Sequence, residues 1–175
     1  MTLTLLVLAM VAAANPFRAA AARAPHTTHR LVGVAVAATL VLVLLAAMLS
    51  GPLLDLVDVS GPNARIAGGI ALLVVALKDT FATPPAPEPA LAGLAGGLIP
   101  MAFPVLFSPA LAVLAIAGAS ERGVVVTLLA AALALIPAAV ILVSGTRPRR
   151  MWLSTAGVFG AGIAALVVLD GVYAI

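Results

Sequence analysis

Long runs without a charged residue constrain this chain more than any other feature. Three runs hold 19, 21 and 19 uncharged residues, from Leu31 to Leu49, Gly123 to Val143 and Met151 to Leu169. A helix needs roughly 20 apolar residues to cross a hydrocarbon core of about 30 Å. The chain is 64% apolar and 9% charged, whereas a soluble domain carries about a quarter charged residues. The sequence therefore predicts an all-α, polytopic membrane protein without a water-soluble domain.

Three further runs bring the predicted number of spans to six. Residues Ser60 to Phe81 begin with Ser-Gly-Pro, which is typical of a helix start with serine as the N-cap. The run from Met1 to Phe17 is the shortest. Ala90 to Ser120 holds 31 uncharged residues, too many for one straight span, and we interpret it as one helix broken near its middle by proline. The prolines in it are Pro100, Pro104 and Pro109.

The first run has a second interpretation. Its apolar stretch, followed by Ala12-Ala13-Ala14, is also typical of a signal peptide with its cleavage site. The basic residues that begin such a peptide are missing, and the repeat described below gives this run a partner later in the chain. We therefore expect the run to be a span.

The positions of the basic residues predict the orientation, because cytoplasmic connections are enriched in lysine and arginine. If the N-terminus is outside, seven of the nine basic residues are cytoplasmic, and the outer ones, Arg65 and Arg122, lie among acidic residues. The cytoplasmic residues are Arg18, Arg23, Arg30, Lys78, Arg147, Arg149 and Arg150. We expect both termini on the outer face.

Two sequence matches share one offset of 93 residues. Asn15-Pro16 aligns with Ser108-Pro109, and Gly69-Ile70-Ala71 aligns with Gly162-Ile163-Ala164. The repeat unit contains three spans, so the second copy enters the membrane from the opposite side. The sequence thus predicts two inverted three-helix repeats, residues 1–82 and 91–175, joined by a proline-rich linker at 83–90. Inverted repeats with interrupted helices at matching positions are typical of transporters.

The interrupted helices are the first and the fourth, and they suggest a binding site. Proline removes a backbone donor and frees a carbonyl four residues earlier, and in lipid such a group needs a partner. If the two breaks meet, they present Asn15, Pro16, Ser108 and Pro109 to one place, and these are the predicted substrate-binding residues. The other interpretation is that the prolines only improve helix packing.

Two arginines complete the predicted site, and each has an alternative role. Arg18 lies at membrane depth if the first span continues to about Ala24, and it would then bind an anionic substrate or lipid. If the span ends near Phe17, Arg18 only extends to the membrane surface. Arg65 is expected either to anchor its helix at the interface or to bind phosphate near the helix N-terminus.

The residues needed for most enzyme classes are missing. The chain has no cysteine and only two histidines, both in one connection, so we expect neither a metal nor another cofactor. No phosphate loop or serine elbow is present, and no acidic residue lies in the middle of a predicted span. No basic patch alternates with aromatic residues, so nucleic acid is not an expected partner.

Small residues offer faces for close helix packing. Gly93 and Gly97 form a Gly-x-x-x-Gly motif, and α-helical spacing also aligns Ala156 with Gly160 and Gly157 with Ala161. These faces either pack within the protein or bind another membrane subunit. The expected partners are therefore the lipid bilayer and other membrane subunits.

The chain resembles the MarC family of small bacterial membrane proteins, which is itself similar to LysE-type amino-acid exporters. The resemblance rests on Asn15-Pro16, on the segment from Arg65 to Ile70, and on the stretch from Pro100 to Pro109. It implies six spans, two inverted halves and a transporter-like fold in the bacterial cytoplasmic membrane. Where the family tends to have glycine and a second proline after Asn-Pro, and Gly-Pro-Gly in the fourth span, this chain has Phe17-Arg18-Ala19-Ala20 and Ser108-Pro109-Ala110.

Two functions follow from these features. The inverted repeats favour a small transporter or exporter of unknown substrate. The changed motifs, the missing mid-span carboxylate and the small size favour an accessory subunit that does not transport and instead stabilises a larger membrane complex.

Overall fold

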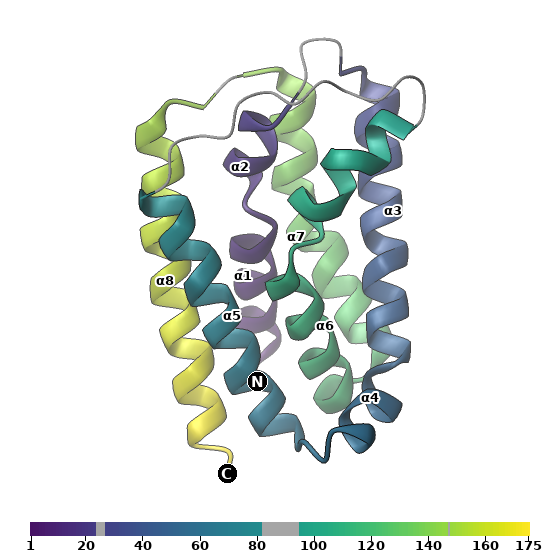
Figure 1. Ribbon diagram of the computed structural model, residues 1–175, viewed down its shortest axis with the longest axis vertical. Helices are drawn as coiled ribbons and strands as arrows, with labels where there is room; N and C mark the ends of the chain where they lie inside the picture. The colour runs from purple at the N-terminus through teal and green to yellow at the C-terminus, as the bar shows by residue number, and fades with distance from the viewer. Residues whose placement is uncertain (24–26, 82–94, 147) are drawn as a thin grey trace.

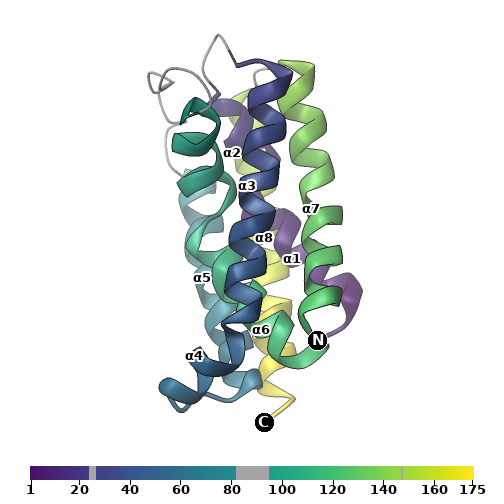
Figure 2. The same ribbon diagram turned by 90° about the vertical axis from the view of Figure 1, so that its right-hand side faces the viewer.

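The protein is a bundle of helices in which the chain runs repeatedly along one long axis (Figures 1 and 2). The computed structural model describes residues 1–23, 27–81, 95–146 and 148–175. The helices are α1 (Leu3–Ala14), α2 (Pro16–Ala21), α3 (His29–Met48), α4 (Ser50–Leu56), α5 (Gly61–Phe81), η1 (Gly97–Leu106), α6 (Pro109–Arg122), α7 (Val124–Ser144) and α8 (Arg150–Val172). The predicted all-α class is confirmed.

Four segments are long and apolar enough to cross a membrane, and a fifth is added if a bent pair counts as one span. The four are Leu3–Ala21, His29–Met48, Val124–Ser144 and Arg150–Val172. The bent pair is η1 with α6, whose axes differ by 67°. Helix α5, which carries Arg65, Lys78 and Asp79, is not among them. These apolar helices indicate a multi-pass membrane protein.

Most predicted helix bounds agree with the structure. Helix α5 ends at Phe81 as expected, and the Ser60 carbonyl accepts the first helical bond, from the Ala64 amide at 3.0 Å. The break in the fourth apolar run lies at Phe107 and Ser108, between η1 and α6. The predicted linker at 83–90 lies outside the described residues, so the division into 1–82 and 91–175 stays a prediction.

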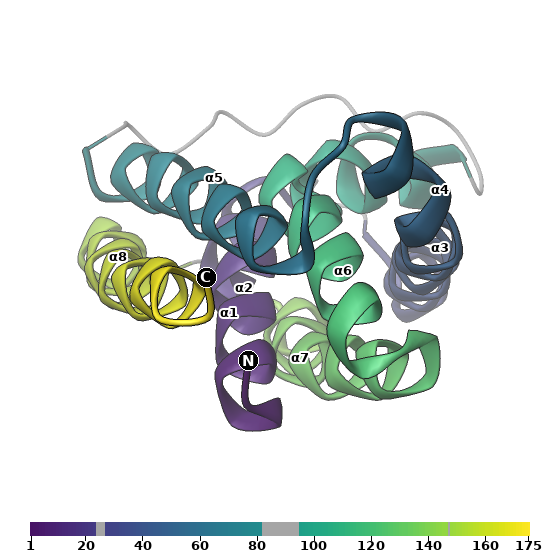
Figure 3. The same ribbon diagram turned by 90° about the horizontal axis from the view of Figure 1, so that it is seen from below.

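The broken helices lie in the middle of the bundle. Seen along its axis, α5 and α8 are side by side at one edge, α3 is at the opposite edge, and α1, α2 and α6 lie between them (Figure 3). About half of Leu3–Ala21 is buried, against a third or less of the other three candidate spans. Alanine supplies much of this core, for example Ala9, Ala13 and Ala110, and its short side chain lets the central helices approach closely.

Gly157 of α8 packs within the protein, against α5. A methyl group added at Gly157 would lie 2.7 Å from the Ala76 carbonyl oxygen and 2.7 Å from the Thr80 nitrogen, both on α5. At Gly69 of α5, an added methyl group would lie 3.1 Å from the Ala164 carbonyl of α8. The α5–α8 contact is therefore a backbone-to-backbone approach that glycine permits. Gly93 lies outside the described residues.

The close α5–α8 contact predicts opposite effects on stability for two substitutions in α8. Gly157→Ala would force α8 away from α5 and lower the free energy of unfolding by about 1–3 kcal/mol, as overpacking does. Gly162→Ala is the matched control, because nothing lies within 4 Å of the added methyl group and alanine favours the helix. Thermal unfolding in detergent measures both, and an equal midpoint for the two variants would contradict the close approach.

Candidate functional site at the junction of two broken helices

The structure brings the two helix breaks together. Helix α1 ends at Ala14 and α2 begins at Pro16, whereas η1 ends at Leu106 and α6 begins at Pro109. The Ser108 hydroxyl donates a hydrogen bond to the Ala13 carbonyl at 3.1 Å, across 95 positions of sequence. We call this region the junction, and it consists of Asn15, Arg18, Asp79, Ser108 and the backbone carbonyls that they contact.

Asn15 makes the first break. Its φ angle of +31° takes the chain out of the helix, and asparagine tolerates this better than most residues. Its side-chain oxygen then accepts from the amides of Phe17 at 3.1 Å and Arg18 at 3.2 Å, so it caps the new helix. Pro16 occupies the first helical position, where no amide hydrogen is needed.

The breaks free several backbone carbonyls, and two of them accept from Arg18. The Ala13 carbonyl has lost the Phe17 amide to the Asn15 side chain. Four residues after Val105 comes Pro109, which has no N–H to donate. A carbonyl left without a donor inside a membrane protein costs several kcal/mol. Arg18 supplies both donors: its Nη2 lies 2.6 Å from the Ala13 oxygen and 3.1 Å from the Val105 oxygen.

Asp79 balances the charge of Arg18. Its Oδ2 accepts from Arg18 Nη1 at 3.1 Å and from Asn15 Nδ2 at 2.7 Å. The Arg18 and Asp79 side chains are only 16% and 8% exposed. Either charge would be costly alone at this depth, whereas the pair is tolerated because each group meets its opposite and a neutral donor or acceptor as well.

Ser108 caps the helix after the second break, as Asn15 caps the helix after the first. Its backbone is extended, with φ −79° and ψ 159°, and its hydroxyl oxygen accepts from the Leu111 amide at 3.3 Å. The same hydroxyl donates to Ala13, so one side chain caps α6 and holds α1. Proline again follows the cap.

The expectations for this region are met unevenly. Asn15, Pro16, Arg18, Ser108 and Pro109 lie together as expected, but their role as substrate ligands stays a prediction. Whether the first span ends near Phe17 or continues to about Ala24 stays a prediction, but the helix resumes after Asn15 and runs to Ala21. In place of open bulk solvent, the guanidinium contacts a carboxylate and two carbonyls.

Sequence reasoning missed Asp79. The sequence did offer a signal for it. A largely buried arginine requires an anion, and the predicted topology puts two acidic residues, Asp79 and Glu88, on the same side of the membrane as Arg18. Lys78 is exposed. Asp79, the next residue of α5, lies on a different side of the helix and reaches the junction.

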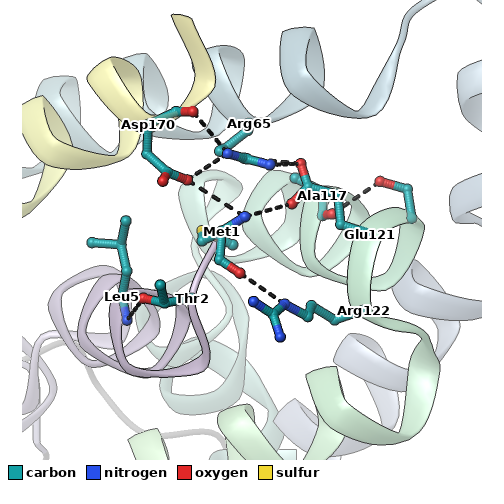
Figure 4. A network of polar contacts seen from close by, with 9 residues as sticks. Met1, Thr2, Leu5, Arg65, Ala117, Glu121, Arg122 and Asp170 are labelled. Atoms are coloured by element: carbon teal, nitrogen blue, oxygen red, sulfur yellow. Dashed lines mark hydrogen bonds and ion pairs between the residues drawn. The ribbon is translucent and has the colours of Figure 1, made fainter. Parts of the chain in front are cut away.

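Arg65 lies apart from the junction, near the other end of α5. Its Nε donates to Glu121 Oε1 at 2.8 Å and its Nη1 to the Asp170 carbonyl at 2.8 Å, and it is ion-paired with both carboxylates (Figure 4). The Met1 ammonium group joins them, 3.0 Å from Glu121 Oε2. Arg65 is 5% exposed. It therefore ties α5 to α6 and α8, and two carboxylates already occupy the positions that a phosphate would need.

Metal chemistry has no support among the described residues. Within residues 1–23, 27–81, 95–146 and 148–175, no three His, Asp or Glu side chains cluster around a point that could hold an ion. His29 is exposed at the start of α3, and His26 lies outside the described residues. The polar chemistry of the junction is thus that of one cation, one carboxylate, an amide and backbone carbonyls.

No protein-family model, curated protein or solved structure matches this chain. The interpretation of the junction therefore depends on its own geometry.

A double-mutant cycle tests how tightly the junction is coupled. Arg18→Gln removes the counter-charge of Asp79 and weakens the contacts to both freed carbonyls, and it should cost about 3–5 kcal/mol of stability. Asp79→Asn should cost less, because the amide oxygen still accepts from Asn15 and Arg18. The double variant should be more stable than the sum of the two costs predicts, with a coupling of about 1–3 kcal/mol. Unfolding in detergent gives all four values, and strict additivity would mean that the two side chains do not interact.

Proposed function

We propose that this protein is a small MarC-like or LysE-like transporter or exporter whose substrate path passes through the junction. One observation carries the proposal: a largely buried Arg18–Asp79 pair lies where two broken helices meet. Ionisable residues inside a membrane protein are costly, and by default they mark a substrate or ion pathway. Half-helix ends, with freed carbonyls and capped amides beside such a pair, are the usual construction of a transporter site.

Matching element positions support two inverted three-helix repeats within this function. Asn15 and Ser108, which are 93 positions apart, are both helix caps followed by proline. The same shift carries α3 onto residues 122–141 and α5 onto residues 154–174. Helices α7 (Val124–Ser144) and α8 (Arg150–Val172) overlap most of each range, within one or two residues of its ends. In this proposal the repeats are residues 1–82 and 91–175.

Helix α5, the third span in chain order, brings the number of spans in the proposed topology to six. Its 21 residues make a helix about 32 Å long, and it lies along the candidate span α8 (Figure 1). Two of its charges are matched: Arg65 by Glu121 and Asp170, and Asp79 by Arg18. Such pairing makes a charged helix acceptable within a membrane bundle.

The second candidate, an accessory subunit that does not transport, is favoured by a different observation. The Phe17 ring stacks on Trp152 of α8, with ring centroids 5.8 Å apart and an interplanar angle of 22°. The polar groups of the junction also bind one another. A closed junction of this kind suits a rigid scaffold whose outer helix faces bind a larger membrane complex.

Cysteine labelling separates the two functions without knowledge of the substrate. The chain has no cysteine, so single variants carry a single thiol. Ala14→Cys and Ala110→Cys place it beside the two breaks, at positions that are 0% exposed. In a transporter, an impermeant maleimide should modify both variants from either side of the membrane, because the junction opens to each side in turn.

Ala47→Cys is the matched control, since Ala47 on α3 is also 0% exposed but belongs to neither of the buried clusters that contain Ala14 and Ala110. It should react from neither side. If all three variants stay unmodified in vesicles of either orientation, the junction does not open and the accessory function replaces transport.

We further propose that both termini face the outside of the bacterial cytoplasmic membrane. The two chain ends and α4 lie toward one end of the bundle, whereas α2 ends and α8 begins at the other (Figure 1). Arg18, Arg23, Arg149 and Arg150 belong to that second end, which the basic-residue bias places in the cytoplasm.

Fusions to a reporter test this orientation. Green fluorescent protein attached after Ile175 should stay dark and alkaline phosphatase attached there should be active, because both would be exported. The reverse pattern is expected for fusions made after Gly145, at the end of α7. A fluorescent C-terminal fusion would contradict the orientation.

A further inference from the structure

We infer that the junction binds a small monovalent anion together with one proton, and that Asp79 occupies the anion's place on Arg18 when the site is empty. This inference rests on the proposed transport function. It deepens that function by naming the class of substrate and the group that carries the proton.

The guanidinium of Arg18 has one fixed edge and one exchangeable edge. Its Nη2 holds the carbonyls of Ala13 and Val105, which belong to the two helix breaks and have lost their own donors. Among the residues that the structure describes, its Nη1 donates to a side chain alone, the Asp79 carboxylate at 3.1 Å. An anion that replaces Asp79 therefore leaves the two carbonyl contacts intact and accepts a charge-assisted hydrogen bond from Nη1.

Asp79 comes from a different helix and is held by little else. Arg18 is on α2 and Asp79 is on α5, two residues before that helix ends. Apart from Arg18, the carboxylate contacts Asn15 Nδ2 at 2.7 Å. Release of Asp79 thus needs a movement of one side chain near a helix end, and Asn15 can keep its contact with the carboxyl group.

Charge balance requires the proton. Arg18 stays protonated under all relevant conditions, so the empty site contains one positive and one negative charge and is neutral. If an anion takes the place of Asp79 and no proton arrives, the site carries a net negative charge in a buried position, which is costly. A proton taken from water onto the displaced carboxylate restores neutrality. The site then holds Arg18 with its bound anion, and a neutral Asp79.

The other charges near this end of α5 do not replace Asp79. Lys78 is its exposed neighbour on α5, and Arg149 and Arg150 begin α8, which packs along α5. All three are cations and favour the approach of an anion. The carboxylates of Glu121 and Asp170 are bound to Arg65, which is 14 positions away along α5 and so about 21 Å distant.

A dependence of binding on pH distinguishes this site from a purely structural ion pair. The purified protein in detergent is titrated with lactate and with methanesulfonate, a carboxylate and a sulfonate that both stay monovalent, and the apparent Kd is taken from the rise in Tm. Uptake of one proton per anion makes the apparent Kd increase with pH, by at most tenfold for each unit of pH. In Asp79→Asn, which is neutral at every pH, binding should persist and the slope should vanish.

Two variants provide the controls. Asp170→Asn removes a carboxylate from the Arg65 network and should keep the wild-type slope. The Arg18→Gln/Asp79→Asn double variant lacks the cation and reports the general effect of salt on Tm. The inference is overturned if wild-type binding has no slope with pH, or if Asp79→Asn keeps the wild-type slope.

A third titration, with phosphatidylglycerol in mixed micelles, identifies the source of the anion. If this lipid alone stabilises Asp79→Asn, the same anion chemistry belongs to a lipid headgroup. If none of the three probes stabilises Asp79→Asn beyond the double variant, the junction is not an anion site. Binding with the expected slope, combined with no thiol labelling at Ala14→Cys or Ala110→Cys, would leave the anion site standing and refute transport.

Discussion

The structure depends on how the protein satisfies backbone carbonyls at two interrupted helices. An apolar environment offers no water to a carbonyl that has lost its amide, so each break must bring its own donor. Arg18 serves both breaks with one nitrogen, and Ser108 adds a second donor to the Ala13 carbonyl. The packing of the central helices and the burial of Asp79 follow from this arrangement, because the arginine that provides the donors also needs a counter-ion.

Helix α5 contributes one side chain to each ion pair that Arg18 or Arg65 forms. Near its start Arg65 reaches carboxylates on α6 and α8, and near its end Asp79 reaches the cation on α2. The sign of the charge that α5 contributes is opposite at the two ends. Between them α5 meets α8 through glycine, where no long side chain separates the two backbones. The helix is therefore fixed by electrostatic contacts at its ends and by close packing along its length.

The all-α class and most helix bounds were predictable because lipid leaves few choices. Runs of about 20 apolar residues separated by arginine have one stable form in a bilayer, and the helix bounds at Gly61 and Phe81 could be placed within a residue or so from Ser60, Pro62 and the next prolines. The positions of both breaks could also be predicted, because Asn-Pro and Ser-Pro combine a helix cap with a residue that cannot continue the preceding helix.

The ion pairs could not be assigned in the same way. Whether an arginine near a span end is solvated or buried depends on the rotation of its helix about its own axis, and a nearly uniform apolar surface such as that of α3 or α8 does not fix this rotation. Asp79 and Lys78 illustrate the problem, since adjacent residues differ by 100° around a helix and only one of them reaches the junction. The predicted topology narrowed the choice of partner for Arg18, but only the structure shows that Asp79 is in contact with it.

The stacked rings of Phe17 and Trp152 have a mechanical consequence. Helix α2 has only six residues and is separated from α1 by the turn at Asn15, so it can rotate about that turn as a unit. The Phe17–Trp152 contact joins α2 to the first turn of α8. Farther along α8, Gly157 packs closely against Thr80, the residue after Asp79. Helix α2, the start of α8 and the end of α5 form one block, with Asn15 as its pivot. A displacement of this block would carry Arg18 and Asp79 together past the stationary half of the bundle.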